Sequence, residues 1–374
     1  MFIGKIKLEN ILSFKDAELE LRPLNVLIGA NASGKSNLIR AFDLIRSLPK
    51  DMQEKIADGG GPTAWINRRT GSPARIELLD LDGIGPSYSI VFRAVGQSYE
   101  IVTEDVPGLF HRRLDDVKFE ARTRKEYLMF GALLHQAVLA RFDSVIKQWG
   151  VPNHPVGPLA NALRGIRLYR EFKTGPGTQA RQGINASAIA DSLSEDGSNL
   201  ALVLNEINHR SGLRRVNEAL QRFCDLFEEV RILTRGGSAQ VYVKEKDVTE
   251  PFAATSLSDG TLRLLCLLAI LLDPSPPLLI CIEEPEIGMH PDAIQMAADL
   301  LVEASSRTQL IVTTHSPALL DALTGQPESV VVCERDFDGF TTFKRLNQSD
   351  LDTWLEDYSL GELWTKGEIG GNRW

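Results

Sequence analysis

One loop near the start of the chain has the residue types and spacing that bind the phosphates of a nucleotide. Residues 29–36, Gly-Ala-Asn-Ala-Ser-Gly-Lys-Ser, match G-x-x-x-x-G-K-[ST] at every fixed position. In such a loop backbone N–H groups surround the β-phosphate, Lys35 reaches the β- and γ-phosphates, and the Ser36 hydroxyl ligates Mg²⁺. The expected nucleotide contacts are Asn31, Ala32, Ser33, Gly34, Lys35, Ser36 and Asn37.

The residues on either side of this loop predict a strand before it and a helix after it. Residues 24–28 form an apolar run that is typical of a buried strand. In residues 37–48, apolar positions recur at helical spacing, namely at Leu38, Ala41, Phe42 and Ile45. The helix would begin at the loop with its N-terminus toward the anion. Strand, loop and helix together predict a nucleoside triphosphate site.

A second candidate site lies where an apolar segment ends in two carboxylates. Residues 278–282 are apolar and lead directly into Glu283 and Glu284, as expected at the C-terminal edge of a parallel sheet. Neighbouring strand residues point to opposite sides, so the two acids have different tasks. We assign Glu283 to Mg²⁺ and Glu284 to orienting and deprotonating the attacking water. The alternative is two solvated acids at a strand end.

Two further segments complete the candidate site. Ser258, Asp259 and Gly260 precede an apolar helix over 262–272, so their amides and hydroxyls would lie at a helix N-terminus, a site for anions. A simple helix cap has the same pattern. Residues 309–313 predict another buried strand, followed by His315, which would lie beside the carboxylates and contact the γ-phosphate and the water.

The order of these motifs resembles that of the ABC-type ATPases of the RecF/SMC-like branch. In that resemblance they are Walker A (29–36), the signature motif (257–261), Walker B (282–286), the D-loop (288–291) and the switch histidine, His315. The segments 10–14, 361–364 and 367–371 are similar to the stand-alone prokaryotic AAA_21-like, or OLD-related, ATPases. In the resemblance Glu283 replaces the usual Walker B aspartate. The Q-loop glutamine stays open among Gln136, Gln148, Gln179 and Gln182.

The resemblance implies an Mg²⁺-dependent ATPase that works as a head-to-tail homodimer around two ATP molecules. Lys35, Glu284 and His315 would be its catalytic residues, and ATP in place of GTP is implied by the resemblance alone. Ser258, Asp259 and Gly260 of one subunit would lie at the ATP of the other, with Ser258 and Gly260 on the γ-phosphate. Because the chain has one Walker A and one signature motif, a symmetric dimer is the simplest assembly.

The expected fold is α/β, a P-loop ABC-type ATPase head with a mostly parallel central sheet. Its N- and C-terminal halves would be 1–108 and 229–374, including a small antiparallel β subdomain over 74–106. An inserted, compact and mainly helical lobe would occupy 109–228, with helical periodicity over 109–149. With 374 residues and 43 % hydrophobic content, the chain can bury a sizeable core.

Composition points to a cytoplasmic protein with no membrane segment. None of the four cysteines has C-x-x-C spacing, and residues 1–12 lack the pattern of a secretory signal. The most apolar stretch, 262–272, has about half the length of a bilayer helix. The net charge is −9, yet residues 110–181 hold 13 Lys/Arg against 6 Asp/Glu. This block either contacts double-stranded DNA or forms a solvated helical face.

These observations support three functions, in decreasing order of preference. The first is an ATPase of DNA repair, DNA maintenance or anti-phage defence that grips DNA with Arg122, Arg124, Lys125, Arg164, Arg167 and Arg170 or positions an effector protein. The second is a nucleotide-switched regulator or scaffold that holds an effector without DNA. The third is the ATP-binding subunit of a transporter. A nuclease is disfavoured, because Asp336 and Asp338 fit a hairpin turn better than a metal site.

Overall fold

The computed structural model describes residues 3–81, 87–107, 110–113, 116–119, 128–131, 136–140, 156–188 and 190–371. The chain divides into two compact units. Unit 1 comprises Met1–Ile166, Glu328–Leu346 and Ile369–Trp374, and unit 2 comprises Arg167–Pro327 and Asn347–Glu368. These boundaries differ from the predicted head and lobe, because a strand of the predicted lobe, β10 (Arg167–Tyr169), pairs with β15 (Leu279–Glu283) of the predicted head.

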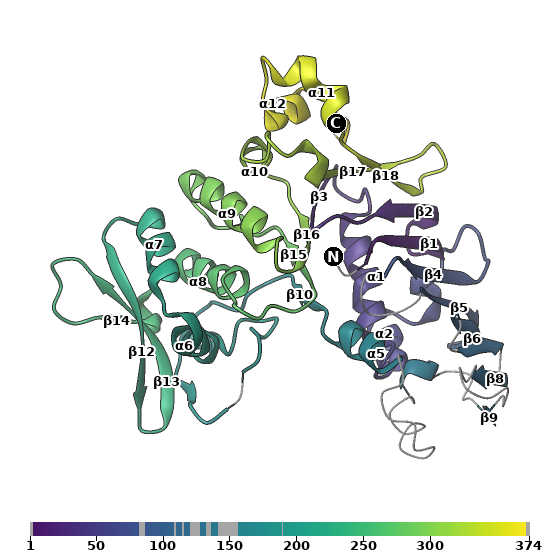
Figure 1. Ribbon diagram of the computed structural model, residues 1–374, viewed down its shortest axis with the longest axis horizontal. Helices are drawn as coiled ribbons and strands as arrows, with labels where there is room; N and C mark the ends of the chain where they lie inside the picture. The colour runs from purple at the N-terminus through teal and green to yellow at the C-terminus, as the bar shows by residue number, and fades with distance from the viewer. Residues whose placement is uncertain are drawn as a thin grey trace. The chain divides into compact units, whose positions relative to one another are not determined.

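Unit 1 contains an antiparallel sheet in which apolar and polar residues alternate. Its strand order is β2-β1-β4-β5-β6-β7-β8-β9 (Figure 1). The bounds are β1 Lys5–Ile11, β2 Phe14–Glu20, β4 Ala74–Leu79, β5 Tyr88–Val95, β6 Ser98–Val106, β7 Phe110–Arg113, β8 Asp116–Phe119 and β9 Leu128–Gly131. Ile6, Leu8, Ile76 and Leu78 are fully buried, which gives the sheet one core face. The predicted antiparallel subdomain over 74–106 is confirmed and extends further on both sides.

The helical prediction for 109–149 is wrong for residues 110–113, 116–119 and 128–131, and most of the remaining segment lies outside the described residues. Strands β7, β8 and β9 occupy its first half and pair with one another antiparallel. In β8 the sequence Asp-Val-Lys-Phe alternates charged and apolar residues, which suits a strand, and the high charge content obscured this period of two. The described residues 110–113, 116–119 and 128–131 are therefore strands where the sequence suggested helix.

A second group of strands in unit 1 carries the phosphate-binding loop. The entirely buried β3 (Leu24–Ile28) runs parallel to β17 (Val330–Arg335), which forms an antiparallel hairpin with β18 (Thr341–Arg345). Helix α1 (Lys35–Ser47) follows the loop and buries Leu38, Phe42 and Ile45. It packs against α2 (Met52–Asp58) and α5 (Val156–Arg164), while α3 (Pro62–Trp65) packs against α2. The predicted strand, helix and hairpin are confirmed.

In unit 2, three parallel strands carry the predicted carboxylates and histidine. Strand β15 lies between β10 and β16 (Gln309–Thr313), with Glu283 opposite Thr313. Both β15 and β16 are almost wholly buried, which explains their continuous apolar sequences. Helices α8 (Asp259–Leu271) and α9 (Pro291–Ala304) pack against each other beside them (Figure 1). The predicted buried helix is therefore α8.

A smaller sheet and five more α-helices complete the described part of unit 2. Strands β11 (Ile184–Asn185), β13 (Ser238–Glu245), β12 (Phe227–Arg235) and β14 (Phe252–Ala253) are antiparallel, and α6 (Leu200–Ser211) and α7 (Arg214–Phe223) pack on β12 and β13. Helix α12 (Leu360–Lys366) packs on α10 (Pro317–Asp321), and α11 (Gln348–Leu355) precedes it. A Cβ at Gly361 would lie 2.3 Å from the Pro317 carbonyl oxygen, so this glycine permits the contact. Part of the C-terminal segment thus supports the helix that follows His315.

The core position of α8 leads to a stability prediction. Leu268 is fully buried, so Leu268→Ala should lower the free energy of unfolding of unit 2 by about 2–5 kcal/mol. Leu226 is 59 % exposed, and Leu226→Ala should change that free energy by less than about 0.5 kcal/mol. Urea titrations followed by circular dichroism measure both. Equal losses in the two variants would contradict the packing described for α8.

Candidate active site

The phosphate-binding loop adopts a backbone conformation that requires its glycines. Gly29 and Gly34 have φ angles of +147° and +116°, and Ala32 between them has +62°. A Cβ at Gly34 would lie 2.2 Å from Thr341 Oγ1, and a Cβ at Gly29 would lie 2.2 Å from the Cys333 carbonyl oxygen. Both fixed glycines are therefore needed for conformation and for close packing on the β17–β18 hairpin.

The polar groups of the loop fit a triphosphate. Lys35 is only 6 % exposed, and its Nζ donates to the carbonyl oxygens of Gly29 at 2.6 Å and Ala30 at 3.1 Å, so the ammonium is held inside the loop. The buried Ser33 Oγ has no hydrogen-bond partner among the described residues. Gly34 is the N-cap of α1 and offers no side-chain cap, so the positive end of the helix dipole faces the loop and favours an anion there.

Neighbouring segments of unit 1 fix the loop and border a cavity. Thr341 Oγ1 donates to the Ser33 carbonyl at 2.8 Å, and Arg335 Nε donates to the Ala32 carbonyl at 2.8 Å. A cavity of about 330 Å³ adjoins this region, and its wall includes Asn37 and Ser13, joined by a 2.9 Å hydrogen bond. Its charged lining residues are all arginines, namely Arg40, Arg68, Arg69 and Arg335. The electrostatic character of this cavity favours an anionic ligand.

In unit 2, Glu283 lies at the end of β15 beside an arginine that the sequence did not place there. Arg170 follows β10, whose Tyr169 is in register with Ile282, and Arg170 Nε lies 3.0 Å from Glu283 Oε1. Sequence analysis assigned Arg170 to a DNA-contacting block and left the Q-loop residue open. The residue that the structure brings to this carboxylate is Arg170, and strand pairing, not a motif, explains its position.

Glu284 occupies a strained backbone position and faces the histidine. Its φ angle is +47°, which is uncommon for a residue with a side chain, and its N–H donates to the Thr313 carbonyl at 2.9 Å. His315 Nε2 lies 3.9 Å from Glu284 Oε1. The two acids thus have different neighbours, Arg170 for Glu283 and His315 for Glu284.

Glu286 joins the loops that follow β15 and β16. Its Oε1 accepts hydrogen bonds from the Thr314 hydroxyl and from the His315 backbone N–H, the latter at 3.2 Å. Its Oε2 is buried without a hydrogen-bond partner among the described residues. Burial raises the pKa of this carboxyl above its ordinary value, although the hydrogen bond from Thr314 lowers it. Sequence analysis gave Glu286 no role, yet it fixes the position of the histidine backbone.

The carboxylates line a second cavity, of about 320 Å³, whose wall includes Glu283, Glu284, Arg170 and Arg263. Among the residues with described positions, no group of three or more His, Cys, Asp or Glu lies close enough to hold a metal ion. Mg²⁺ in nucleotide sites is commonly held by one or two protein ligands together with phosphate oxygens and water. The two ligands predicted from the sequence lie in different units, Ser36 in unit 1 and Glu283 in unit 2, so their joint coordination of Mg²⁺ stays a prediction.

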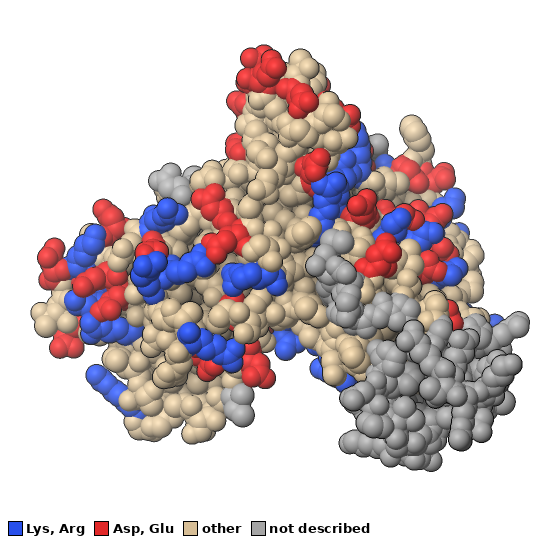
Figure 2. Space-filling view, in the orientation of Figure 1, with Lys and Arg blue, Asp and Glu red and all other residues tan. Residues whose placement is uncertain are grey.

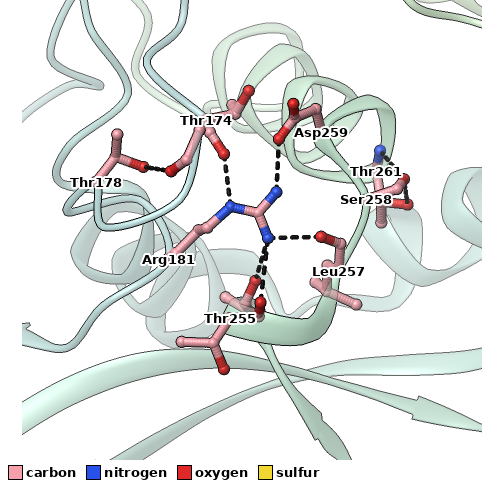
Figure 3. A network of polar contacts seen from close by, with 10 residues as sticks. Thr174, Thr178, Arg181, Thr255, Leu257, Ser258, Asp259 and Thr261 are labelled. Atoms are coloured by element: carbon pink, nitrogen blue, oxygen red, sulfur yellow. Dashed lines mark hydrogen bonds and ion pairs between the residues drawn. The ribbon is translucent and has the colours of Figure 1, made fainter.

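The signature segment forms a tightly packed turn at the start of α8. Ser258 is the N-cap, and its Oγ accepts the Thr261 N–H at 3.1 Å. A Cβ at Gly260 would lie 2.8 Å from the Gly288 carbonyl oxygen of the predicted D-loop. Asp259 pairs with Arg181, which also contacts the preceding backbone (Figure 3). Sequence analysis missed Arg181, because it lies 78 residues from Asp259 and belongs to no motif.

The predicted DNA-contacting arginines have partners within the chain wherever they are described. Arg164 donates to the Pro49 carbonyl, Arg167 to the Ser192 hydroxyl, and Arg170 pairs with Glu283. Arg122, Arg124, Lys125 and the Q-loop candidate Gln148 lie outside the described residues. On the described part of the face in Figure 2, positive and negative side chains are interspersed. Among the described residues of 110–181, the three arginines predicted to contact DNA are therefore engaged within the chain.

Fold and motif order together define an ABC-type ATPase head of the RecF/SMC-like branch. The chain belongs to the family described as "AAA domain, putative AbiEii toxin, Type IV TA system", whose model matches residues 24–127 and 182–321. The matched regions include the phosphate-binding loop, the signature, both carboxylates and His315. In the part of the chain that the structure describes, no helix is long and apolar enough to cross a membrane.

One curated relative and two solved structures add to this assignment. The chain is 23 % identical over 352 residues to the "Old nuclease" of Escherichia phage P2, covering 86 % of this chain but only 57 % of that protein. A crystal structure of an Smc head bound to the C-winged helix domain of ScpA matches with TM-score 0.52 and 14 % identity, covering 94 % of this chain and all of that one. An Smc head with an extended coiled coil, bound to the C-terminal domain of ScpA derived from Pyrococcus furiosus, matches with TM-score 0.52 and 15 % identity. This match covers 95 % of this chain and 99 % of that one. These two structures show a shared fold.

The buried ammonium of Lys35 predicts a loss of nucleotide affinity on its removal. Lys35→Met keeps much of the side-chain volume but removes the charge, so the Kd for Mg²⁺-ATP should rise at least about tenfold, or 1.4 kcal/mol. Isothermal titration calorimetry measures this change. Lys244→Met, which removes a lysine paired with Glu228 in unit 2, should leave the Kd unchanged. An unaltered Kd in Lys35→Met would contradict the assigned phosphate site.

The raised pKa of Glu286 predicts a pH-dependent stability difference. The folded chain retains this proton to higher pH than the unfolded chain, so the group's contribution to stability falls as pH rises above the unfolded value of 4.5 toward the folded pKa. Glu286→Gln removes this titration. The unfolding free energy of the variant relative to the native protein should therefore increase over that pH window. Parallel urea titrations between pH 4 and 8 test the sign; a constant difference would refute it.

Proposed function

We propose that this protein binds ATP with Mg²⁺, hydrolyses it to ADP and phosphate, and associates head to tail with a second copy while ATP is bound. The observation that carries the proposal is the arrangement at the ends of β15 and β16. There a strained Glu284 lies 3.9 Å from His315, and Glu286 binds the His315 backbone. A carboxylate and an imidazole held in this way suit the activation of a water molecule.

In the proposed reaction, each residue has a distinct task. Lys35 and the loop amides bind the phosphate oxygens, and Glu284 accepts a proton as the water oxygen attacks the γ-phosphorus. The bond between that phosphorus and the bridging oxygen breaks, releasing ADP and phosphate. His315 orients the water and the γ-phosphate. Ser36 and Glu283 would hold Mg²⁺, which supplies charge neutralisation when bound.

The arginine-lined cavity of unit 1 supports ATP as the ligand of the phosphate-binding loop. It adjoins α1 through Asn37 and Arg40 and reaches Ser13 in the β1–β2 turn. A nucleotide whose phosphates lie in the loop would place its remaining part in such a neighbouring cavity. The absence of an acidic residue from the described lining removes a source of repulsion toward phosphate.

The signature turn supports association with a second copy. Ser258 and Gly260 lie at the N-terminus of the 13-residue helix α8, where backbone N–H groups and the helix dipole favour an anion. The family resemblance assigns that anion to the γ-phosphate held by another subunit. One chain supplies a single phosphate loop and a single signature turn, so two chains would form two equivalent sites.

We consider two alternative roles for the ATP-bound protein. The first proposal is a role in DNA repair, DNA maintenance or defence, with DNA bound through part of 110–181 in a cytoplasmic protein. The second is a regulator that holds an effector protein without DNA. Intramolecular partners of Arg164, Arg167 and Arg170 favour the second. Salt-dependent binding of a DNA duplex by the isolated protein would support the first.

The proposed catalytic role of Glu284 makes a direct prediction. Glu284→Gln should lower the ATP turnover number about 10²- to 10⁴-fold, since the amide cannot accept the proton. It should also trap the ATP-bound state, so that light scattering records the mass of a dimer with Mg²⁺-ATP and of a monomer without nucleotide. Glu218→Gln, at an exposed ion pair on α7, serves as the matched control.

The contact between the signature turn of one subunit and the ATP of the other is tested in the Glu284→Gln variant. Ser258→Arg replaces a small side chain with a bulky one at the signature turn. Combined with Glu284→Gln, it should abolish the ATP-dependent dimer while ATP still binds. A dimer that persists in this double variant would contradict the signature contact. A Glu284→Gln protein with unchanged ATP turnover would contradict the catalytic assignment itself.

A further inference from the structure

The signature turn is attached to a distant loop by one buried guanidinium. Arg181 is 8 % exposed and belongs to the loop between β10 and β11. It donates to the carbonyl oxygens of Thr174 (2.6 Å), Ala254 (3.1 Å), Thr255 (3.3 Å) and Leu257 (2.5 Å) and to Asp259 Oδ1 (2.5 Å). Figure 3 shows this side chain pointing into the turn that leads to Ser258.

We propose that Arg181 is a positioning residue that shapes the signature turn for an incoming phosphate and neutralises Asp259 within it. The inference rests on the proposed function, in which this turn meets the nucleotide of a second copy. Arg181 never touches that nucleotide. It acts through the backbone carbonyls of residues 254–257 and through the carboxylate of Asp259.

The carbonyl contacts explain why an arginine is required. The three acceptors before Ser258 converge on Nη1, while Nε and Nη2 reach Thr174 and Asp259 in other directions. A planar guanidinium has five N–H groups in a fixed fork, whereas a lysine ammonium is a single point with three donors. Loss of the guanidinium would leave buried carbonyls unpaired, and the turn would change shape to satisfy them.

Asp259 explains why a positive charge is required at this place. An acidic side chain in the first turn of α8 is favourable for the isolated helix but opposes a second anion at the same terminus. The Asp259 side chain is 57 % exposed and lies in the first turn of α8, the helix terminus at which the proposed phosphate would bind. Arg181 balances its charge from the buried side. The turn can therefore keep an acid and still bind a phosphate.

Arg181 also connects the signature turn to the small sheet of unit 2. Its carbonyl oxygen accepts a hydrogen bond of 2.9 Å from Gln240 Nε2 on β13, and β13 pairs with β14, which leads directly into 254–256. On its other side the turn contacts the D-loop, where Gly260 meets the Gly288 carbonyl. The turn is thus held by three segments of the chain that lie far apart in sequence.

The first test measures ATP-dependent dimerisation in the Glu284→Gln background. Adding Arg181→Ala should raise the dimer dissociation constant at least about tenfold without changing the Kd of ATP for the monomer, because the phosphate loop is intact. Adding Asp259→Asn to Arg181→Ala should recover at least about threefold of that loss. A merely structural role for Arg181 would give no recovery from removal of a charge. Dimerisation that is unchanged by Arg181→Ala overturns the inference.

Arg307→Ala is the matched control, since Arg307 also donates to main-chain carbonyls of Leu271 and Asp273, at the other end of α8. Its dimerisation should equal that of Glu284→Gln alone. A second readout is ATP turnover after mixing Arg181→Ala with Lys35→Met, at a protein concentration at which neither variant alone turns over ATP measurably. In a mixed dimer the loop of the first chain meets the intact signature turn of the second, so ATP turnover should return. No return on mixing would overturn the inference.

Hydrogen exchange separates failure of this inference from failure of the proposed function. In the nucleotide-free monomer, Arg181→Ala should speed exchange of amides in 255–261 at least about tenfold, and Arg307→Ala should not. If Glu284→Gln never dimerises with ATP, the proposed function fails, and the exchange rates alone decide whether Arg181 holds the turn. Unchanged exchange in 255–261 would refute its positioning role in either case.

Discussion

The carboxylate of Glu286 is the contact on which the position of His315, one of the proposed catalytic residues, depends. Parallel pairing of β15 with β16 brings their C-terminal ends to one edge, but the residues that do chemistry lie in the loops beyond these ends. Glu286 accepts hydrogen bonds from the Thr314 hydroxyl and the His315 N–H. These bonds connect the loop after β15 to the loop after β16. The same burial that raises its pKa makes these hydrogen bonds stronger than they would be in water.

Close backbone approach is the second constraint, and it recurs in both units. Gly34 leaves room for Thr341 above the phosphate loop, and Gly260 leaves room for the Gly288 carbonyl beneath the signature turn. In each case another segment fixes a loop at the N-terminus of a helix, α1 or α8. A loop that is already fixed by packing loses little conformational entropy when a ligand binds. This would favour phosphate binding at the two proposed sites.

Local periodicity made much of this fold predictable, while long-range pairing made the rest unpredictable. Residues 24–28 and 309–313 are apolar throughout because both faces of their strands are buried, so their sequences alone predicted β3 and β16. Charge-rich β8 was misread as helix. The contact of Arg170 with Glu283 follows from the pairing of β10 with β15, and that of Arg181 with Asp259 spans 78 residues. Counting charges in a segment cannot reveal such partners.

The C-terminal segment acts on the active site through packing. Helix α10 begins directly after the histidine loop, with Ser316 as its N-cap, and α12 lies against it through Gly361. The Gly361 N–H donates to Asp321 Oδ1 at 2.8 Å, which fixes α12 at the end of α10. The loop of His315 is therefore held on both sides, by Glu286 at its start and by α10 and α12 beyond it. A segment with no chemical group in the reaction thus helps to determine where the imidazole lies.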